Sequence, residues 1–280
     1  MARQDSLSIF DTAETKSKLA ESYGKVIENI EKSTISSLLK NTDLSGDPDS
    51  GSVEARRIAN TDSQAYGTAR SGNKGQKVVA PPVVVNIDTD RELINEVEEK
   101  DLALFGVDGL IAKKTASNER SMKRELERAF FSTAVTAGTS ANLTKEAANE
   151  KLEELIQTLE TVKNEFVDGV ERDLINIICT PKAYGEIRNF LDSGAKNSNI
   201  DTAVGEFGMF HSVNVFSSVY LPDGVDMIAM CQGAVAQPVK TSLDEAGKIP
   251  LSDAYHFGMF YYYGTKAIMP DLIFKVESAA

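Results

Sequence analysis

The chain has 280 residues, of which 41% are hydrophobic and 26% charged, the proportions of a globular protein with one large or two ordinary domains. Its 42 acidic and 30 basic residues give a net charge of −12, which opposes binding of the whole molecule to DNA or anionic lipid. The longest apolar stretch, Val78 to Val85, is broken by Pro81 and Pro82 and is far shorter than the roughly 20 residues of a membrane-spanning helix. Met1 to Phe10 has no apolar core behind a basic start, so a secretory signal is not expected. We therefore expect neither a disordered chain, nor a membrane protein, nor a dedicated reader of nucleic acid.

The first predicted element is a helix from Ala13 to Leu39. Its large apolar residues recur near the 3.6-residue period of a helix, with charged residues between them. These apolar positions are Leu19, Tyr23, Val26, Ile27, Ile30, Ile35 and Leu38. Such a stripe requires a partner, and Ile27 and Ile30 are candidates for contact with a neighbouring subunit.

A polar segment follows from Asn41 to Gln76, with too few large aliphatic residues to form a core. We expect an extended hairpin that turns at Asn60 to Asp62 and reaches a neighbouring subunit; a mobile linker is the alternative. The residues expected in its arms are Val53 and Ala55 on one side and Tyr66, Thr68 and Arg70 on the other. Basic side chains on such a hairpin would gain electrostatic complementarity over an acidic neighbour. The candidates for this intersubunit contact are Arg56, Arg57, Arg70 and Lys74.

The middle of the chain is predicted to be mostly helical. Val78 to Ile87 has the pattern of a strand, which its two prolines restrict to an edge or a break. Asp90 to Leu104 is predicted as a short helix, Ser117 to Val135 as a long amphipathic one, and Thr144 to Phe166 as a third. The apolar side of the long helix consists of Met122, Leu126, Ala129, Phe130 and Thr133.

The last third is predicted to be mostly strand. A short apolar run, Leu174 to Cys179, precedes Thr180 and Pro181, which are typical of the first positions of a helix. Glycines and prolines then separate the predicted strands Met209 to Phe216, Val225 to Cys231, His256 to Tyr263 and Ala267 to Val276. Cys179 and Cys231 lie inside apolar runs, where buried thiols are expected.

Residues that carry catalysis are scarce. His211 and His256 are the only histidines, they lie 45 residues apart, and no metal-binding or nucleophile motif accompanies them. Gly67 and Gly72 have the spacing of a phosphate-binding loop, but Asn73 stands where that loop needs lysine. We therefore predict no catalytic, cofactor-binding or metal-binding residues and no cofactor. The apolar helix stripe, the extended polar segment and the long helix all require partners, which favours a structural protein that assembles with other subunits over an enzyme.

In this order, the predicted elements resemble the major capsid proteins of tailed bacteriophages, whose shell fold is shared with encapsulins. Ile177-Ile178-Cys179-Thr180-Pro181 resembles the strand, proline and helix step of that family. Gly208 to Val215 is similar to the family's short G-x-P-V region, although it lacks the proline, and Tyr263 to Pro270 is similar to its closing strand.

The resemblance implies an α+β fold with four parts: an N-terminal arm, an extended E-loop hairpin, a peripheral domain with a long spine helix, and an axial domain of mixed β-sheet with flanking helices. The implied bounds are residues 1–45 for the arm, 46–77 for the E-loop, 78–166 and about 237–263 for the peripheral domain with its spine at 117–135, and 167–236 and about 264–280 for the axial domain.

The resemblance also implies a function. Copies of the chain would form the hexamers and pentamers of an icosahedral shell that encloses double-stranded DNA without sequence-specific binding. The protein would be assembled in the cytoplasm of a host bacterium, become part of the virion, and work with portal and scaffolding proteins. With about 45 residues ahead of the hairpin, we expect a separate scaffolding protein or none. Two alternatives stay open: an encapsulin-like compartment shell, and a hydrolase or other enzyme whose pocket the sequence does not reveal.

Overall fold

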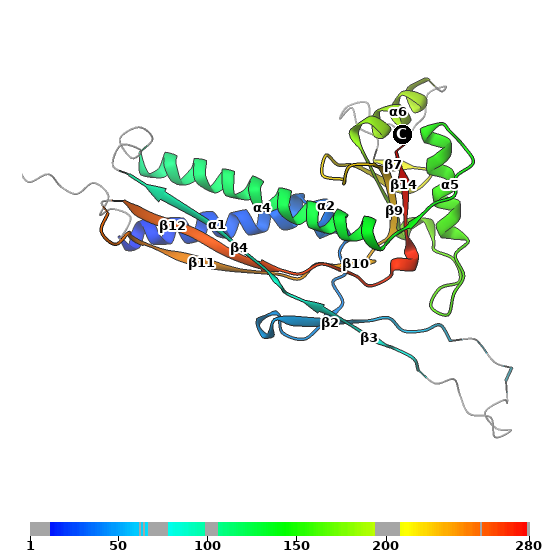
Figure 1. The fold of residues 1–280 in the computed structure, drawn as a ribbon, viewed down its shortest axis with the longest axis horizontal. Coiled ribbons are helices and arrows are strands. Elements are labelled where there is room, and N and C mark those ends of the chain that lie inside the picture. The colour runs from blue at the N-terminus through cyan, green and yellow to red at the C-terminus, as the bar shows by residue number, and fades with distance from the viewer. Residues whose placement is uncertain are drawn as a thin grey trace, which may run out of the picture.

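One long helix, α4 (Val107–Ala137), joins an elongated part of the molecule to a more compact body (Figure 1). We call the elongated part the arm; it is a different unit from the N-terminal arm of the sequence prediction. The computed structural model describes residues 12–61, 63, 65–66, 78–98, 106–193, 208–252 and 254–278. α4 begins ten residues before the predicted spine helix, and its buried side includes Met122, Leu126 and Phe130, as predicted. None of the helices among these residues is both long and apolar enough to cross a membrane.

The arm consists of two helices packed on a three-stranded antiparallel sheet. The helices are α1 (Ala13–Ser33) and α4, and the strands lie in the order β11 (Val239–Lys248), β12 (Tyr255–Tyr263) and β4 (Thr89–Val97). Alternate residues of β12 point toward the helices, so that Phe257, Met259 and Tyr261 are buried against Leu19 and Tyr23 of α1. The apolar stripe of α1 is thus covered within its own chain.

The predicted N-terminal helix is divided in two at Thr34. α1 ends there, and the Thr34 side chain accepts a hydrogen bond from the backbone N–H of Ser37 and so caps α2 (Ile35–Leu39). The Thr34 hydroxyl also donates to the Ile30 carbonyl, at 2.7 Å. The break turns α2 toward the compact body, where Leu39 is buried among side chains of α4 and the large sheet.

The helix predicted over Asp90 to Leu104 is wrong, because residues 89–97 form strand β4. Leu93 and Val97 are four residues apart, which fits one face of a helix but equally fits one face of a strand. The register Met259↔Leu93 and Tyr255↔Val97 places both on the helix-facing side of the sheet. Pairing along the whole of β12 decides in favour of the strand.

The compact body is a six-stranded mixed sheet in the order β5-β14-β9-β6-β8-β7. These strands are β5 (Thr139–Ser140), β6 (Ile175–Cys179), β7 (Met209–Phe210), β8 (Val213–Ser217), β9 (Val225–Cys231) and β14 (Ile273–Glu277). β6 runs parallel to β8 and antiparallel to β9, and every residue of it is buried. The predicted strand 209–216 is a hairpin, since His211 and Ser212 have positive φ angles and turn the chain between β7 and β8.

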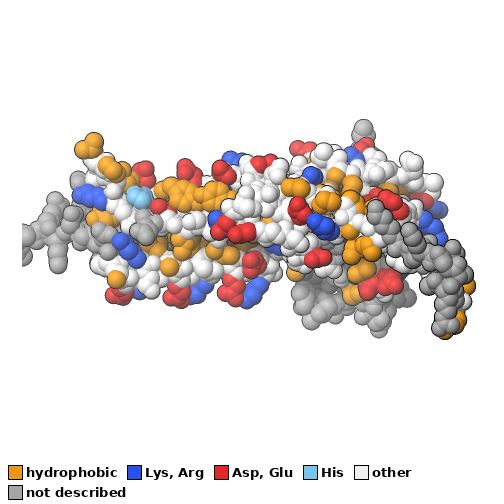
Figure 2. Space-filling model, turned by 90° about the horizontal axis from the view of Figure 1, so that it is seen from below, with side chains coloured by type: hydrophobic (Ala, Val, Ile, Leu, Met, Phe, Trp, Pro, Cys, Tyr) orange, Lys and Arg blue, Asp and Glu red, His pale blue; other side chains and the backbone are white. Residues whose placement is uncertain are grey.

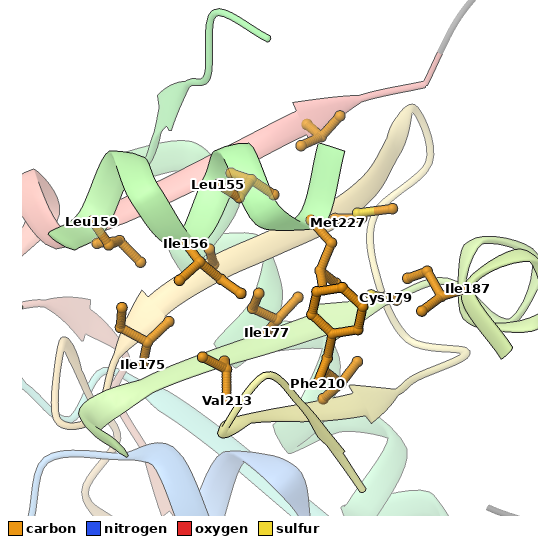
Figure 3. Close-up of a cluster of buried hydrophobic side chains, with 14 of the residues drawn as sticks. Leu155, Ile156, Leu159, Ile175, Ile177, Cys179, Ile187, Phe210, Val213 and Met227 are labelled. Atoms are coloured by element: carbon orange, nitrogen blue, oxygen red, sulfur yellow. The ribbon is translucent and has the colours of Figure 1, made fainter. Parts of the chain in front are cut away.

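Helices α5 (Ala148–Glu160) and α6 (Pro181–Ser193) pack against this sheet (Figure 3). Leu155, Ile156 and Leu159 of α5 meet Ile177 and Met227 of the strands. α5 therefore belongs with the compact body rather than with the elongated domain to which residues 144–166 were assigned. The predicted start of α6 at Pro181, directly after a buried strand, is confirmed.

A third, smaller sheet leaves the body at the junction with the arm. It consists of β1 (Leu44–Ser45), β2 (Ser52–Arg56) and the edge strand β3 (Pro82–Asn86). β2 pairs with β3 from Ser52↔Asn86 to Arg56↔Pro82, so β3 is the strand that pairs with the first arm of the hairpin. Of the predicted second arm, residues 66–70, only Tyr66 is described, and the turn predicted at 60–62 ends outside the described residues. The short antiparallel pair β10 (Val235–Ala236) and β13 (Lys266–Ala267) adjoins this sheet, and Ala236 packs against Val53, Ala55 and Val85.

Candidate assembly surface: the projecting hairpin and its anchor

β2, β3 and the described residues between them form what we call the projecting hairpin, which extends away from both bodies (Figure 1). Its base packs against the rest of the chain. There Val53, Ala55 and Val85 are buried against Ala236 and Ile268. The Lys266 ammonium also donates to the Val84 carbonyl of β3, at 2.8 Å.

Gly264 fixes how closely the base approaches the core. An added Cβ at this position would lie 1.7 Å from the Asn86 carbonyl oxygen and 3.2 Å from the Ile87 Cα. No side chain can occupy that space without moving the end of β3. The Gly264 position, between β12 and β13, therefore requires glycine for close backbone contact.

Arg57 anchors the hairpin to the compact body. Its guanidinium donates to both carboxylate oxygens of Asp271, at 2.6 and 2.9 Å, and lies 4.5 Å from the centre of the Phe166 ring. Asn164 donates to the same carboxylate at 2.5 Å. The Arg57 side chain is only 13% exposed. A bidentate pair stacked on an aromatic ring holds one orientation, so the hairpin leaves the body in a defined direction.

The electrostatics of this anchor favour a charged Asp271. Burial raises the pKa of its carboxyl group, but the hydrogen bonds and charge of Arg57 and the amide of Asn164 outweigh burial and hold the pKa below its ordinary value. Two backbone bonds extend the contact, from the Ala59 N–H to the Val79 carbonyl and from the Asn60 N–H to the Glu165 carbonyl, at 2.9 and 3.0 Å.

Beyond the anchor the hairpin exposes apolar side chains. Ile58 is 66% exposed and Val78 75%, and Val79 is exposed beside them. Nearer the base, Val84, opposite Glu54, is exposed as well. Several large aliphatic side chains exposed on one projecting segment are typical of an interaction surface. Sequence reasoning missed these residues, although the apolar run from Val78 to Val85, interrupted by two prolines, was a signal that it could have used.

The predicted intersubunit residues have different environments. Arg56 is exposed, and its one ion pair among the described residues is a 3.4 Å contact with Glu54 of its own strand. Arg57 is already paired within the chain, as described above. Ile30 is 4% exposed and Ile27 is partly buried, because α4 and β12 cover the stripe that the sequence left without a partner. Arg70 and Lys74 lie outside the described residues.

The polar clusters elsewhere have structural roles. His211 Nδ1 lies 2.8 Å from Glu153, which together with Glu160 binds Arg172, and His256 lies 2.8 Å from Asp244. Burial raises the pKa of the Cys179 thiol to about 12, which keeps it protonated and unreactive. Among the described residues, no three side chains of the metal-binding types lie close enough together to hold an ion.

Comparisons with known proteins agree on the architecture. No family model and no curated protein matches the sequence. The fold is similar to the solved capsid of cyanophage P-SCSP1u, with a TM-score of 0.58 at 13% identity over 88% of each chain. It is also similar to the capsid of an empty GTA particle, with a TM-score of 0.59 at 11% identity over 88% of this chain and 90% of that one.

A third similar structure is a virus-like particle from Pyrococcus furiosus. Its TM-score is 0.57 at 15% identity, over 92% of this chain and 98% of that one. At these identities the comparisons establish the fold, and the α+β shell fold predicted from the order of the elements is confirmed.

Proposed function

We propose that this protein is the major capsid protein of a tailed phage, a structural subunit that assembles with copies of itself into a closed shell around double-stranded DNA. The observation that carries the proposal is the projecting hairpin, which Arg57 anchors to the compact body and which exposes the apolar side chains of Ile58 and Val78. Likeness to proteins that form capsids supports this reading.

In such a shell the hairpin of one copy would lie over its neighbour. Each contact can be weak, because repetition around a closed lattice multiplies small contributions into a stable assembly. Arg56, with Arg70 and Lys74, would add electrostatic complementarity at the rim of this contact. Portal and scaffolding proteins are further partners of the proposed capsid, and the virion is its proposed location.

Electron microscopy and light scattering of the purified protein test the proposal. We expect closed shells, or hexamers and pentamers that close when the salt concentration or a crowding agent is changed. A 30 kDa monomer that persists at high concentration under all these conditions would contradict it.

An encapsulin-like compartment is the alternative that the sequence left open, and the similar structures do not favour it over the capsid. The contents of shells recovered from the native source separate the two functions. Double-stranded DNA inside them would support the capsid, whereas a co-purifying enzyme without DNA would support the compartment.

A further inference from the structure

A row of arginines follows the solvent-exposed ridge of α4. Arg120, Arg124 and Arg128 are spaced four residues apart, so they lie on one side of the helix and rise by about 6 Å from one to the next. All three are exposed. The helix edges on either side of this ridge contact α1 and the sheet, as the bonds Asn29 to Glu119 and Arg91 to Glu125 indicate.

These three arginines have no direct ion-pair partner among the described residues, whereas α1 neutralises its lysines in pairs such as Lys25 with Glu21. Three acids are adjacent to these arginines in sequence, and each has another partner. Glu119 accepts from Asn29, Glu125 is bound by Arg91 and by the hydroxyl groups of Tyr261 and Tyr263, and Glu127 is buried and accepts from Ser36. In a molecule with a net charge of −12, the ridge is a local cationic surface.

A groove lies beside the ridge. Its volume is about 420 Å³, and Arg91, Arg124 and Arg128 line it together with Ser121 and Tyr261. Two acidic residues, Glu92 and Glu125, also line the groove, and Glu125 is ion-paired with Arg91. The groove brings Arg91 of β4 beside two of the ridge arginines. Glu125 balances the charge of Arg91, so Arg91 flanks the cationic surface with hydrogen-bond donors and adds no net charge to it.

We propose that this surface, Arg120, Arg124 and Arg128 with Arg91 at its flank, binds the phosphodiester backbone of DNA. The inference rests on the proposed function in that the DNA is the one enclosed by the shell. If the surface binds this DNA, the helical side of the arm faces the interior of the shell. The repulsion of DNA expected from the net charge of −12 then applies to the other surfaces of the molecule.

Two observations favour a nucleic acid over an acidic protein. Protein interfaces have an apolar centre, but none of the large hydrophobic side chains exposed among the described residues belongs to α4. Evenly spaced guanidiniums on a straight, purely polar ridge suit a polymer with regularly repeated phosphates. The underside of the molecule is different, since it exposes hydrophobic side chains bordered by acidic ones along the arm (Figure 2).

The test measures binding of a fluorescent 30-base-pair DNA to the purified unassembled protein between 50 and 200 mM salt. The variant R120Q/R124Q/R128Q should bind at least tenfold more weakly at 50 mM salt. Its slope of log affinity against log salt should be shallower by about 0.9 for each phosphate that the variant no longer neutralises. The variant R120K/R124K/R128K keeps the charges and should retain most of the affinity.

A control variant, K145Q/K163Q/K182Q, removes the same charge from exposed sites on the compact body. It should leave the slope unchanged. Equal loss of affinity in both glutamine variants would reduce the effect to net charge and overturn the inference. So would tighter binding of polyglutamate than of DNA, or a lysine variant as weak as the glutamine one.

Shell formation by the same variants separates this inference from the proposed function. We expect R120Q/R124Q/R128Q to assemble and melt like the parent. Normal shells from a parent protein with no affinity for DNA would remove the inference and leave the capsid function intact. A protein that binds DNA through the ridge but never assembles would contradict the capsid function and leave the DNA-binding surface intact.

Discussion

Arg56 and Arg57 are neighbours in sequence with opposite energetic roles. Arg57 is nearly buried in a bidentate pair with Asp271, and removing it leaves that carboxylate with Asn164 alone. We expect Arg57→Ala to lower the free energy of unfolding by about 2 kcal/mol. Arg56→Ala, at an exposed site, should change it by less than about 0.5 kcal/mol. Urea unfolding of the two variants checks this, and equal effects would show that the anchor does not form.

The same pair predicts a pH dependence. Because Arg57 holds the pKa of Asp271 below its ordinary value, its stabilising effect is fully present above the unfolded-state pKa, near 4. It is lost as the pH falls through the lower, folded-state pKa. The stability difference between the parent and Arg57→Ala should therefore be constant from pH 7 to about pH 5 and shrink below about pH 4.

Two glycines provide a second comparison at the residue scale. Gly264→Ala should cost at least about 2 kcal/mol, because the new Cβ would overlap the Asn86 carbonyl at the base of the hairpin. Gly185 lies in α6 with no atom within 4 Å of an added Cβ. Gly185→Ala should instead stabilise by about 0.5 to 1 kcal/mol. Thermal unfolding distinguishes the two signs, and a tolerated Gly264→Ala would contradict the close approach.

At the scale of elements, one buried acid connects α4 to the start of α2. The Glu127 carboxylate accepts from the backbone N–H of Ser36 at 3.0 Å and from its hydroxyl at 3.3 Å, and its second oxygen is buried without a partner among the described residues. Burial raises the pKa of Glu127, and the bonds from Ser36 offset only part of that rise. The carboxylate thus favours the break between α1 and α2 at the cost of burying a charge.

A raised pKa has the opposite consequence to that of Asp271. The folded state holds the proton of Glu127 more tightly, so this residue removes stability as the pH rises from the ordinary glutamate value, near 4.3, through the folded pKa. Glu127→Gln keeps an acceptor for Ser36 without the charge. The melting temperature of the variant relative to the parent should increase between pH 4 and pH 7. A flat difference for Glu127→Gln would contradict the assignment.

Elements whose burial is local could be predicted from the sequence, and those defined by a distant partner could not. Met122, Leu126 and Phe130 repeat at the helical period, so the buried face of α4 was predictable. β4 was mistaken for a helix because only its register with β12 distinguishes the two periods. β11 was missed altogether, since residues 239–248 have few apolar side chains and are held by pairing with β12.

For the whole molecule, the order of elements was enough to predict the shell fold, because connectivity is preserved where motifs are weak. The candidate site was predicted less well. Basic residues drew attention to the hairpin, but whether a given arginine faces its own chain or a neighbour depends on Asp271 and Phe166, more than 100 residues further on. Likewise, the apolar stripe of α1 gave no sign that β12 would cover it.

The last prediction separates folding from assembly at the hairpin. Ile58 and Val78 are exposed in the isolated chain, so Ile58→Asp with Val78→Asp removes no internal packing and should leave the melting temperature within about 2 °C of the parent. In a shell, burial of each apolar side chain contributes about 1.5 to 3 kcal/mol to the contact between copies. A loss of about 1.4 kcal/mol lowers the association constant of each contact tenfold. Because every copy repeats the loss, shell yield measured by sedimentation should fall by more than tenfold.

The control variant, Ile58→Val with Val78→Ile, keeps both sites apolar and should assemble normally. Raising the salt concentration should not rescue the aspartate variant, whereas it should weaken any contribution from Arg56, which is screened over roughly 8 to 10 Å. Full shell yield from the double aspartate variant would show that the exposed apolar side chains of the hairpin lie outside the contacts between copies.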